Sequence, residues 1–306
     1  MSRIYEALQR ADRERKVAEG SGVEQFVEPE IAADIEEQPP AKDDIVLENI
    51  AQYPWRPSIA SFPTLAERGA GVEQFRSLRS RIYQARYEAP VKTILVSSGM
   101  PSEGKSFVTA NLAMSLARNS VNNILLIDAD LRRPTLHKLL GAPNVPGLSD
   151  YLAGTAELDA IMQRDLRAES AMDASQRSIS NLTFIPSGKC DDNSSELVAN
   201  HRIEELVATL SPCFDWILID SPPVLAVTDA VELARAADAV LLVARGARTP
   251  YAVAQRTQAT FSNSRILGFV LNDVKDAPRR GSYYYYYGEH EPSGAGKQRK
   301  DHGRRG

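Results

Sequence analysis

One eight-residue stretch constrains this chain more than any other: Gly99-Met100-Pro101-Ser102-Glu103-Gly104-Lys105-Ser106. It fits the phosphate-loop pattern, in which four free positions separate a first glycine from a glycine, a lysine and a serine. Residues 93–97 before it form a short apolar run typical of a buried strand, and residues 107–118 after it have the apolar spacing of a helix. This context favours a phosphate loop over an ordinary turn that happens to contain glycine.

The residue types in this loop suit a phosphate chain. Gly99 and Gly104 permit a tight backbone whose N–H groups point inward, and the helix that begins near Phe107 adds free N–H groups and a partial positive charge. Lys105 can reach the outer phosphates, and the Ser106 hydroxyl can ligate Mg²⁺. The residues expected to contact a nucleotide are therefore Gly99, Met100, Pro101, Ser102, Glu103, Gly104, Lys105, Ser106 and Phe107.

Composition narrows the class of protein. The 306 residues are 43% hydrophobic, which is enough for a sizeable core, and the formal net charge of −4 gives no signal for nucleic-acid binding. Two cysteines do not form a disulfide framework, so we expect a reducing compartment. Because no apolar run approaches the roughly 20 residues that span a bilayer, we expect a cytoplasmic protein that reaches the membrane only through a partner or a charged surface.

Changes in composition and charge along the chain predict four regions. Residues 1–17 form a short charged helix with a narrow apolar stripe, which is either marginal in isolation or a docking helix. Residues 18–63 are rich in carboxylates and are expected to be a mostly disordered linker. Residues 64–275 form the folded domain, and residues 276–306 form a flexible tail with a basic end.

The folded domain alternates apolar strands with helices. Strands are expected at residues 93–97, 124–127, 182–185, 216–219, 239–243 and 266–271, with one helix over 72–85 and another over 195–210. Such alternation predicts an α/β fold, a doubly wound, mostly parallel sheet with helices on both faces. Ligands bind such sheets at the carboxyl ends of the strands, so the loop, Asp128, Asp130 and Asp220 should share one edge.

Those three carboxylates follow two buried strands. Asp220 is the expected acidic partner of a phosphate loop and would hold Mg²⁺ directly or through water, although it could instead cap a turn. Asp128 and Asp130 offer one metal partner and one candidate base, a role that contributes about 10²–10⁴-fold to a rate. Arg132 and Arg133 could hold phosphate oxygens, pair with these aspartates or attract an acidic substrate.

The tail contains five consecutive tyrosines. They could form an edge strand or be tolerated low-complexity sequence, but the flanking glycines argue against a strand, and five exposed aromatics invite aggregation. A tyrosine-rich tail beside a phosphoryl-transfer site suggests that the tyrosines accept phosphate. The expected acceptors are Tyr283, Tyr284, Tyr285, Tyr286 and Tyr287.

Together these motifs make the chain similar to the bacterial tyrosine kinases, phosphate-loop autokinases that regulate exopolysaccharide export. The resemblance covers roughly residues 72–287 and residues 2–8, and it includes the loop, the stretch 128–132, the strand end 217–220 and the tyrosine cluster. The family builds a ring of subunits with a glutamate-arginine-arginine helix motif. Its spacing is matched by Glu73, Arg76 and Arg79. One departure is Ser102, because the family loop usually has glycine there and serine adopts a strongly left-handed backbone only at a cost.

The resemblance implies a role for each matching residue. ATP and Mg²⁺ are the implied cofactors, with Lys105 and the loop amides on the ATP phosphates and Ser106 as a ligand of Mg²⁺. Asp128 would activate the incoming tyrosine hydroxyl, while Asp130 and Asp220 would order Mg²⁺ through water. Asn272, at the end of the last strand, resembles the position that contacts adenine in related ATPases.

The resemblance also implies a cellular setting. The chain is similar to the separate cytoplasmic type of these kinases, which the tail of an inner-membrane polysaccharide chain-length protein, a co-polymerase, activates. The tail of one subunit would be phosphorylated by the next subunit of a homo-oligomeric ring, and a cognate tyrosine phosphatase is an expected partner. Each phosphate adds roughly −1.5 to −2 charges, so phosphorylation could loosen the ring.

Two other functions fit parts of the sequence. A partition or septum-site ATPase would be a dimeric switch on the same fold, but that class carries an extra lysine after the first loop glycine, where this chain has Met100, and has no comparable tyrosine tail. A non-catalytic nucleotide-binding scaffold of an export complex is the second. The full set of Lys105, Ser106 and the three aspartates argues against it.

Overall fold

The computed structural model describes residues 49–57, 60–66, 68–118, 121–166, 181–189, 194–198 and 201–274. The expected N-terminal helix and the tail with its tyrosine cluster lie outside these residues. No helix within the described ranges is both long enough and apolar enough to cross a membrane.

An eight-stranded sheet forms the centre of the fold, in the order β1-β4-β5-β3-β6-β2-β7-β8. Every neighbouring pair is parallel except β4 and β5. This confirms the predicted doubly wound, mostly parallel α/β class and all six predicted strands. The strands are β1 (Ala51–Tyr53), β2 (Thr93–Ser98), β3 (Ile124–Asp128), β4 (Gln163–Asp165), β5 (Leu182–Ile185), β6 (Trp216–Asp220), β7 (Ala239–Arg245) and β8 (Ile266–Asn272).

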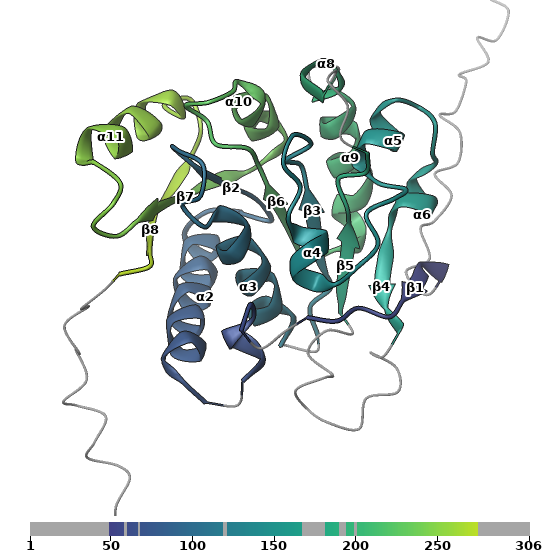
Figure 1. Cartoon of the computed structure of the whole chain (residues 1–306), viewed down its shortest axis with the longest axis horizontal. Helices are drawn as coiled ribbons and strands as arrows, with labels where there is room; N and C mark the ends of the chain where they lie inside the picture. The colour runs from purple at the N-terminus through teal and green to yellow at the C-terminus, as the bar shows by residue number, and fades with distance from the viewer. Residues whose placement is uncertain are drawn as a thin grey trace, which may run out of the picture. The chain divides into compact units, whose positions relative to one another are not determined.

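Helices cover both faces of this sheet (Figure 1). One layer contains α2 (Ala70–Glu88), α3 (Lys105–Ala117) and α4 (Leu136–Leu140), with the short 3₁₀ helix η2 (Pro63–Leu65) beside α2 and α3. The other layer packs on the opposite face of the sheet, over a separate group of buried apolar side chains. It contains α5 (Leu148–Leu152), α6 (Leu158–Ile161), α8 (Ser194–Val198), α9 (Arg202–Leu210), α10 (Asp229–Leu233), α11 (Tyr251–Thr260), and the 3₁₀ turns η4 (Ser211–Cys213) and η5 (Ala234–Ala236).

Successive side chains of the central strands alternate between the two faces of the sheet, which explains the two layers of helices. In β2, Ile94 and Val96 belong to the core under α2 and α3, whereas Leu95 belongs to the opposite core. In β3, Leu126 and Ile127 divide in the same way. Successive side chains of a strand point to opposite faces, so apolar residues at consecutive positions create two cores. The two layers of helices cover the faces of the sheet and leave the carboxyl ends of the strands available for the site.

Two sequence expectations differ from the structure. The disordered linker was expected to reach residue 63, but β1 pairs with β4, and both Trp55 and Phe62 are fully buried. The backbone N–H of Trp55 donates to Asp165 over 3.2 Å, and its indole N–H donates to Gln163 over 3.2 Å. Burial of a large aromatic stabilises this segment against disorder. The single helix expected over 195–210 is instead two, because His201 takes a left-handed φ of 59° before α9.

Candidate active site

The phosphate loop connects β2 to α3 and needs glycine at its last position. Gly104 is the N-cap residue of α3 with a left-handed φ of 93°. The backbone therefore disfavours any larger residue, and a Cβ atom added there would displace the side-chain amide of Asn272. Ser102, two residues before Gly104, has a φ of 64°. The serine therefore occupies the left-handed conformation that side chains disfavour.

Residues at the ends of β7 and β8, and in the segments that follow them, hold this loop in place. The buried Glu103 carboxylate accepts a hydrogen bond from the Met100 N–H over 2.8 Å and another from the Thr249 hydroxyl. The Asn272 amide donates to the Glu103 carbonyl over 3.0 Å. Arg245 pairs with Asp273 over 2.7 Å and donates to the Ser102 carbonyl over 3.4 Å. The loop is thus braced through its own glutamate before any ligand binds.

The three predicted carboxylates meet at the carboxyl ends of neighbouring strands. Asp128 in β3 and Asp220 in β6 are direct register partners, and Asp130 follows two residues after β3. All three are buried, with exposed fractions of 0%, 0% and 2% for Asp128, Asp220 and Asp130. Lys105, the first residue of α3, reaches them and forms an ion pair with Asp130 over 2.8 Å. One lysine therefore lies among three carboxylates at the predicted edge of the sheet.

Burial and mutual repulsion control the protonation of this cluster. Burial, and then the charge of Asp220, raise the pKa of Asp128 well above its usual value, although the N–H of Leu136 opposes the shift. Burial also raises the pKa of Asp220, against the opposing charge of Lys105. For Lys105, burial lowers the pKa, but the charges of Asp220, Asp130 and Asp128 outweigh burial and raise the pKa. The lysine thus stays protonated and compensates the carboxylates.

Asp128 and Asp130 have different surroundings. Asp128 accepts backbone N–H groups of Asp130, Thr135 and Leu136 at 3.3, 3.2 and 3.0 Å, which tie the segment after β3 to the strand end. Asp130 instead lines a cavity of about 740 Å³ beside the loop, together with Lys105 and Ser106. Arg132 also lines this cavity and pairs with the buried Asp229 over 3.0 Å. Of the two candidate bases, only Asp130 faces the open space in this structure.

The donor set suits a nucleotide with a hard cation. Asp220 accepts a hydrogen bond from Thr109 over 3.1 Å at one oxygen, and its buried second oxygen has no hydrogen bond of normal geometry to the described residues. The Ser106 hydroxyl, 3.4 Å from the Lys105 ammonium, offers a further oxygen that could ligate a cation. Across the described ranges, no group of three or more His, Cys, Asp or Glu residues is placed to hold a metal by itself. Hydroxyl and carboxylate oxygens are the ligands that Mg²⁺ prefers, together with phosphate and water.

Comparison with known proteins identifies the family. A family model described as an AAA domain matches residues 91–256. The chain is 37% identical to tyrosine-protein kinase wzc of Salmonella typhimurium over 222 residues, which are 72% of this chain and 29% of that protein. It is 32% identical to tyrosine-protein kinase YwqD of Bacillus subtilis over 218 residues, 71% of this chain and 86% of the relative. The chain belongs to the bacterial tyrosine kinase family.

A solved structure of this kinase family shares the fold. The kinase domain of the Escherichia coli tyrosine kinase ETK matches with a TM-score of 0.60 at 32% identity, over 71% of this chain and 80% of that domain. The aligned part of the chain spans less than a third of the Salmonella kinase and most of the Bacillus kinase. Family membership thus rests on the region that contains the phosphate loop and the carboxylate cluster.

The structure brings together most residues that the kinase motifs predicted, and adds others. The loop, Asp128, Asp130, Asp220 and Asn272 meet at one edge, whereas Glu73, Arg76 and Arg79 lie on α2, where the latter two line a separate cavity. Sequence reasoning missed Thr249, Arg245 and Thr109. Thr109 follows the loop by one helical turn and could have been found from that spacing, because it returns to the site next to Lys105. The other two come from more than 140 residues away and have no local signal.

Proposed function

We propose that this chain is an ATP-dependent protein-tyrosine autokinase that phosphorylates the tyrosines of its own tail in trans. The observation that supports the proposal best is the position of Lys105. It begins α3 at the phosphate loop, pairs with Asp130 and lies close enough to Asp128 and Asp220 for their charges to raise its pKa. A phosphoryl group bound at the loop would enter this arrangement, and phosphoryl transfer depends mainly on such positioning and charge.

The chain's residues would divide the work as follows. The loop amides, including that of Phe107, and Lys105 would bind the ATP phosphates by charge-assisted hydrogen bonds. Ser106 would ligate Mg²⁺, with Asp130 and Asp220 holding its water ligands. When bound, Mg²⁺ neutralises charge on the phosphates. Asn272, which already contacts the loop at Glu103, would meet the adenine end of the nucleotide.

A pair of variants identifies the base that takes the tyrosine proton. We propose Asp128, from the family resemblance, although Asp130 faces the cavity. If Asp128 is the base, Asp128→Asn should lower the transfer rate by about 10²–10⁴-fold and leave ATP affinity nearly unchanged. Asp130→Asn should weaken Mg²⁺-dependent ATP binding instead. The reverse pattern would transfer the base role to Asp130.

The acceptors and the assembly complete the proposal. Tyr283 to Tyr287 of one subunit would reach the site of a neighbour in a ring built partly through Glu73, Arg76 and Arg79 on α2. The exposed Glu73 and Arg76 lie 3.5 Å apart within their own helix, a weak pair that a neighbouring subunit could replace. The process so regulated would be exopolysaccharide polymerisation and export. Its activator would be an inner-membrane co-polymerase at the cytoplasmic face, and a cognate phosphatase would reverse it.

Intact mass tests this function directly. Dephosphorylated protein is incubated with Mg²⁺ and ATP beside two variants, Lys105→Met and a chain in which Tyr283 to Tyr287 are phenylalanine. The wild type should gain phosphates that both variants lack. If the wild type binds ATP but gains no mass, with or without the cytoplasmic tail of a co-polymerase, the chain is a switch or scaffold rather than a kinase.

A further inference from the structure

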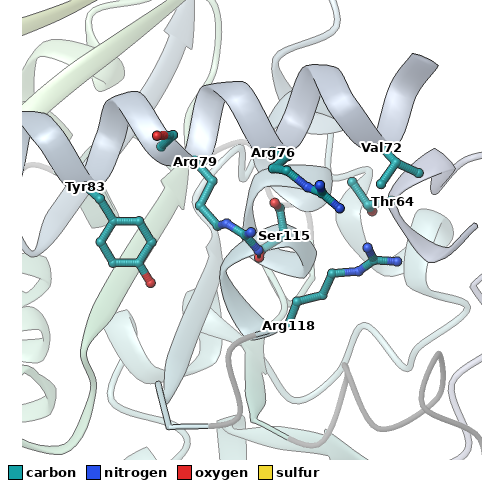
Figure 2. Close-up of a pocket in the computed structure, with 8 residues that line it drawn as sticks. Thr64, Val72, Arg76, Arg79, Tyr83, Ser115 and Arg118 are labelled. Carbon is teal, nitrogen blue, oxygen red and sulfur yellow. Dashed lines mark hydrogen bonds between the residues drawn. The ribbon is translucent and has the colours of Figure 1, made fainter. Parts of the chain in front are cut away.

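A second cavity lies between α2 and the C-terminal half of α3, and three arginines point toward it. Figure 2 shows Arg76 and Arg79 extending from α2, and Arg118 approaching from the end of α3. Its volume is about 660 Å³, within the range of small-ligand sites. The lining, which we call the arginine pocket, is Thr64, Val72, Arg76, Arg79, Ser80, Tyr83, Ser115 and Arg118.

Within the described residues, the positive charge of the arginine pocket is compensated only at Arg76, by its weak exposed pair with Glu73 over 3.5 Å. None of the lining side chains is acidic, and none of the ion pairs in the described ranges includes Arg79 or Arg118. Arg79 donates to the Ser115 carbonyl over 2.5 Å, and Arg118 donates to the Ala66 carbonyl over 2.9 Å. Burial lowers the pKa of Arg118, and the charges of Arg79 and Arg76 lower it further. Three guanidinium groups held together in this way favour an anion between them.

The donors of the arginine pocket suit a phosphate better than a carboxylate. Each guanidinium has five N–H donors, and the carbonyl bonds of Arg79 and Arg118 use only part of them. The Tyr83 hydroxyl accepts a hydrogen bond from Asn122 over 2.6 Å, which leaves its own proton free to donate. A phosphate monoester offers three acceptor oxygens and about −1.5 to −2 charges, so it can satisfy several converging donors at once.

We propose that the arginine pocket binds a phosphorylated tyrosine side chain of the tail segment Tyr283–Tyr287. The volume has room for an aromatic ring behind the phosphate, next to the buried Val72 and the ring of Tyr83. The tyrosine cluster begins nine residues after Val274, the last described residue, and nine residues can span roughly 30 Å. The source of the phosphate rests on the proposed autokinase function, but the binding itself does not.

This occupant gives the pocket a regulatory consequence. Arg76 and Arg79 are also the residues proposed to contact a neighbouring subunit. A phosphotyrosine that occupies them removes their charge from that contact, so the reaction product would compete with the ring. The acidic segment of residues 24–48 is the other candidate anion of this chain, and it offers only carboxylates. The two candidates are distinguished by the following binding experiment.

Fluorescence anisotropy measures binding without any catalysis. The probe is a labelled synthetic peptide of residues 279–291 with phosphate on Tyr285, titrated with the dephosphorylated full chain in the absence of nucleotide. We expect saturable binding of this peptide and at least tenfold weaker binding of the unphosphorylated peptide. Arg118→Gln should weaken binding of the phosphopeptide at least tenfold, because a charge-assisted contact is lost. Arg81→Gln, an exposed arginine of α2 outside the pocket, should change it less than twofold.

A second pair of variants guards against misfolding of Arg118→Gln. Ser80→Asp places a carboxylate in the pocket at an exposed position and should weaken binding tenfold, whereas Ser77→Asp on the same helix should not. The proposal is overturned if both Arg118→Gln and Ser80→Asp bind as the wild type does, or if Lys105→Met abolishes binding, which would place the peptide at the phosphate loop. Equal affinity for a peptide of residues 24–48 would also overturn it and assign the pocket to the acidic segment. Failure of autophosphorylation alone leaves these binding results intact.

Discussion

Replacing Ser102 by glycine should stabilise the protein, because the residue occupies a backbone conformation that glycine adopts freely. Its φ of 64° costs a non-glycine residue about 1–2 kcal/mol. Glycine adds conformational entropy to the unfolded chain, which costs about 0.4–1 kcal/mol in return. Since the Ser102 side chain is exposed, its removal loses no packing. The free energy of unfolding should therefore rise by about 0.5–1 kcal/mol, a Tm increase of about 1–4 °C for a domain of this size.

Differential scanning calorimetry on the wild type, Ser102→Gly and Ser102→Ala tests this reasoning. The alanine variant keeps the left-handed backbone and removes only the hydroxyl, so its Tm should stay close to that of the wild type. Equal Tm increases in both variants would attribute the effect to the hydroxyl and refute the backbone argument. A Tm decrease in Ser102→Gly would refute it as well, because the loop would then gain more from the serine than its conformation costs.

Three further substitutions test other parts of the structure. Gly104→Ala should weaken ATP binding in isothermal titration, because the φ of 93° at Gly104 strains any residue with a Cβ, and that Cβ would displace the Asn272 amide from the loop. Wild-type affinity would contradict this loop geometry. Trp55→Ala should lower the free energy of unfolding in urea by about 3–5 kcal/mol, and a change below about 0.5 kcal/mol would mean that this segment is outside the fold. Leu126→Ala should cost about 2–5 kcal/mol by the same assay, against less than about 0.5 for Val121→Ala, whose side chain is 81% exposed.

The class of the fold could be predicted from the sequence because its central strands carry strong local signals. Residues such as Ile124 to Ile127 are apolar without interruption, which is typical of a strand buried on both faces. The strands β1 and β4 have three residues each, Ala-Gln-Tyr and Gln-Arg-Asp, and neither has an apolar pattern. They form because they pair with each other and because Trp55 packs and bonds across to β4, contacts that no short window of sequence records.

The residues of the candidate site also fall into two groups, those with a local sequence signal and those without one. The loop and its aspartates follow directly from a motif and from strand ends, so the sequence alone places them at one edge of the sheet. The brace through Thr249 and Asn272, and the convergence of Arg118 with Arg76 and Arg79, join residues far apart in the chain. Such contacts depend on how helices pack on the sheet. The helix-spacing rule suggested the arginines of α2 but could not find their third member.

The order of the strands also determines how the fold would respond to tension. β1 lies at one margin of the sheet, and β2, which leads into the phosphate loop, is five strand spacings away, roughly 24 Å at about 4.8 Å each. A pull applied to the chain before Ala51 would be borne first by the three-residue pairing of β1 with β4 and by the two hydrogen bonds of Trp55. Those few contacts would rupture before the load reached β2. The edge of the sheet at β1 would thus unfold first, while the strands that hold the nucleotide site keep their pairing.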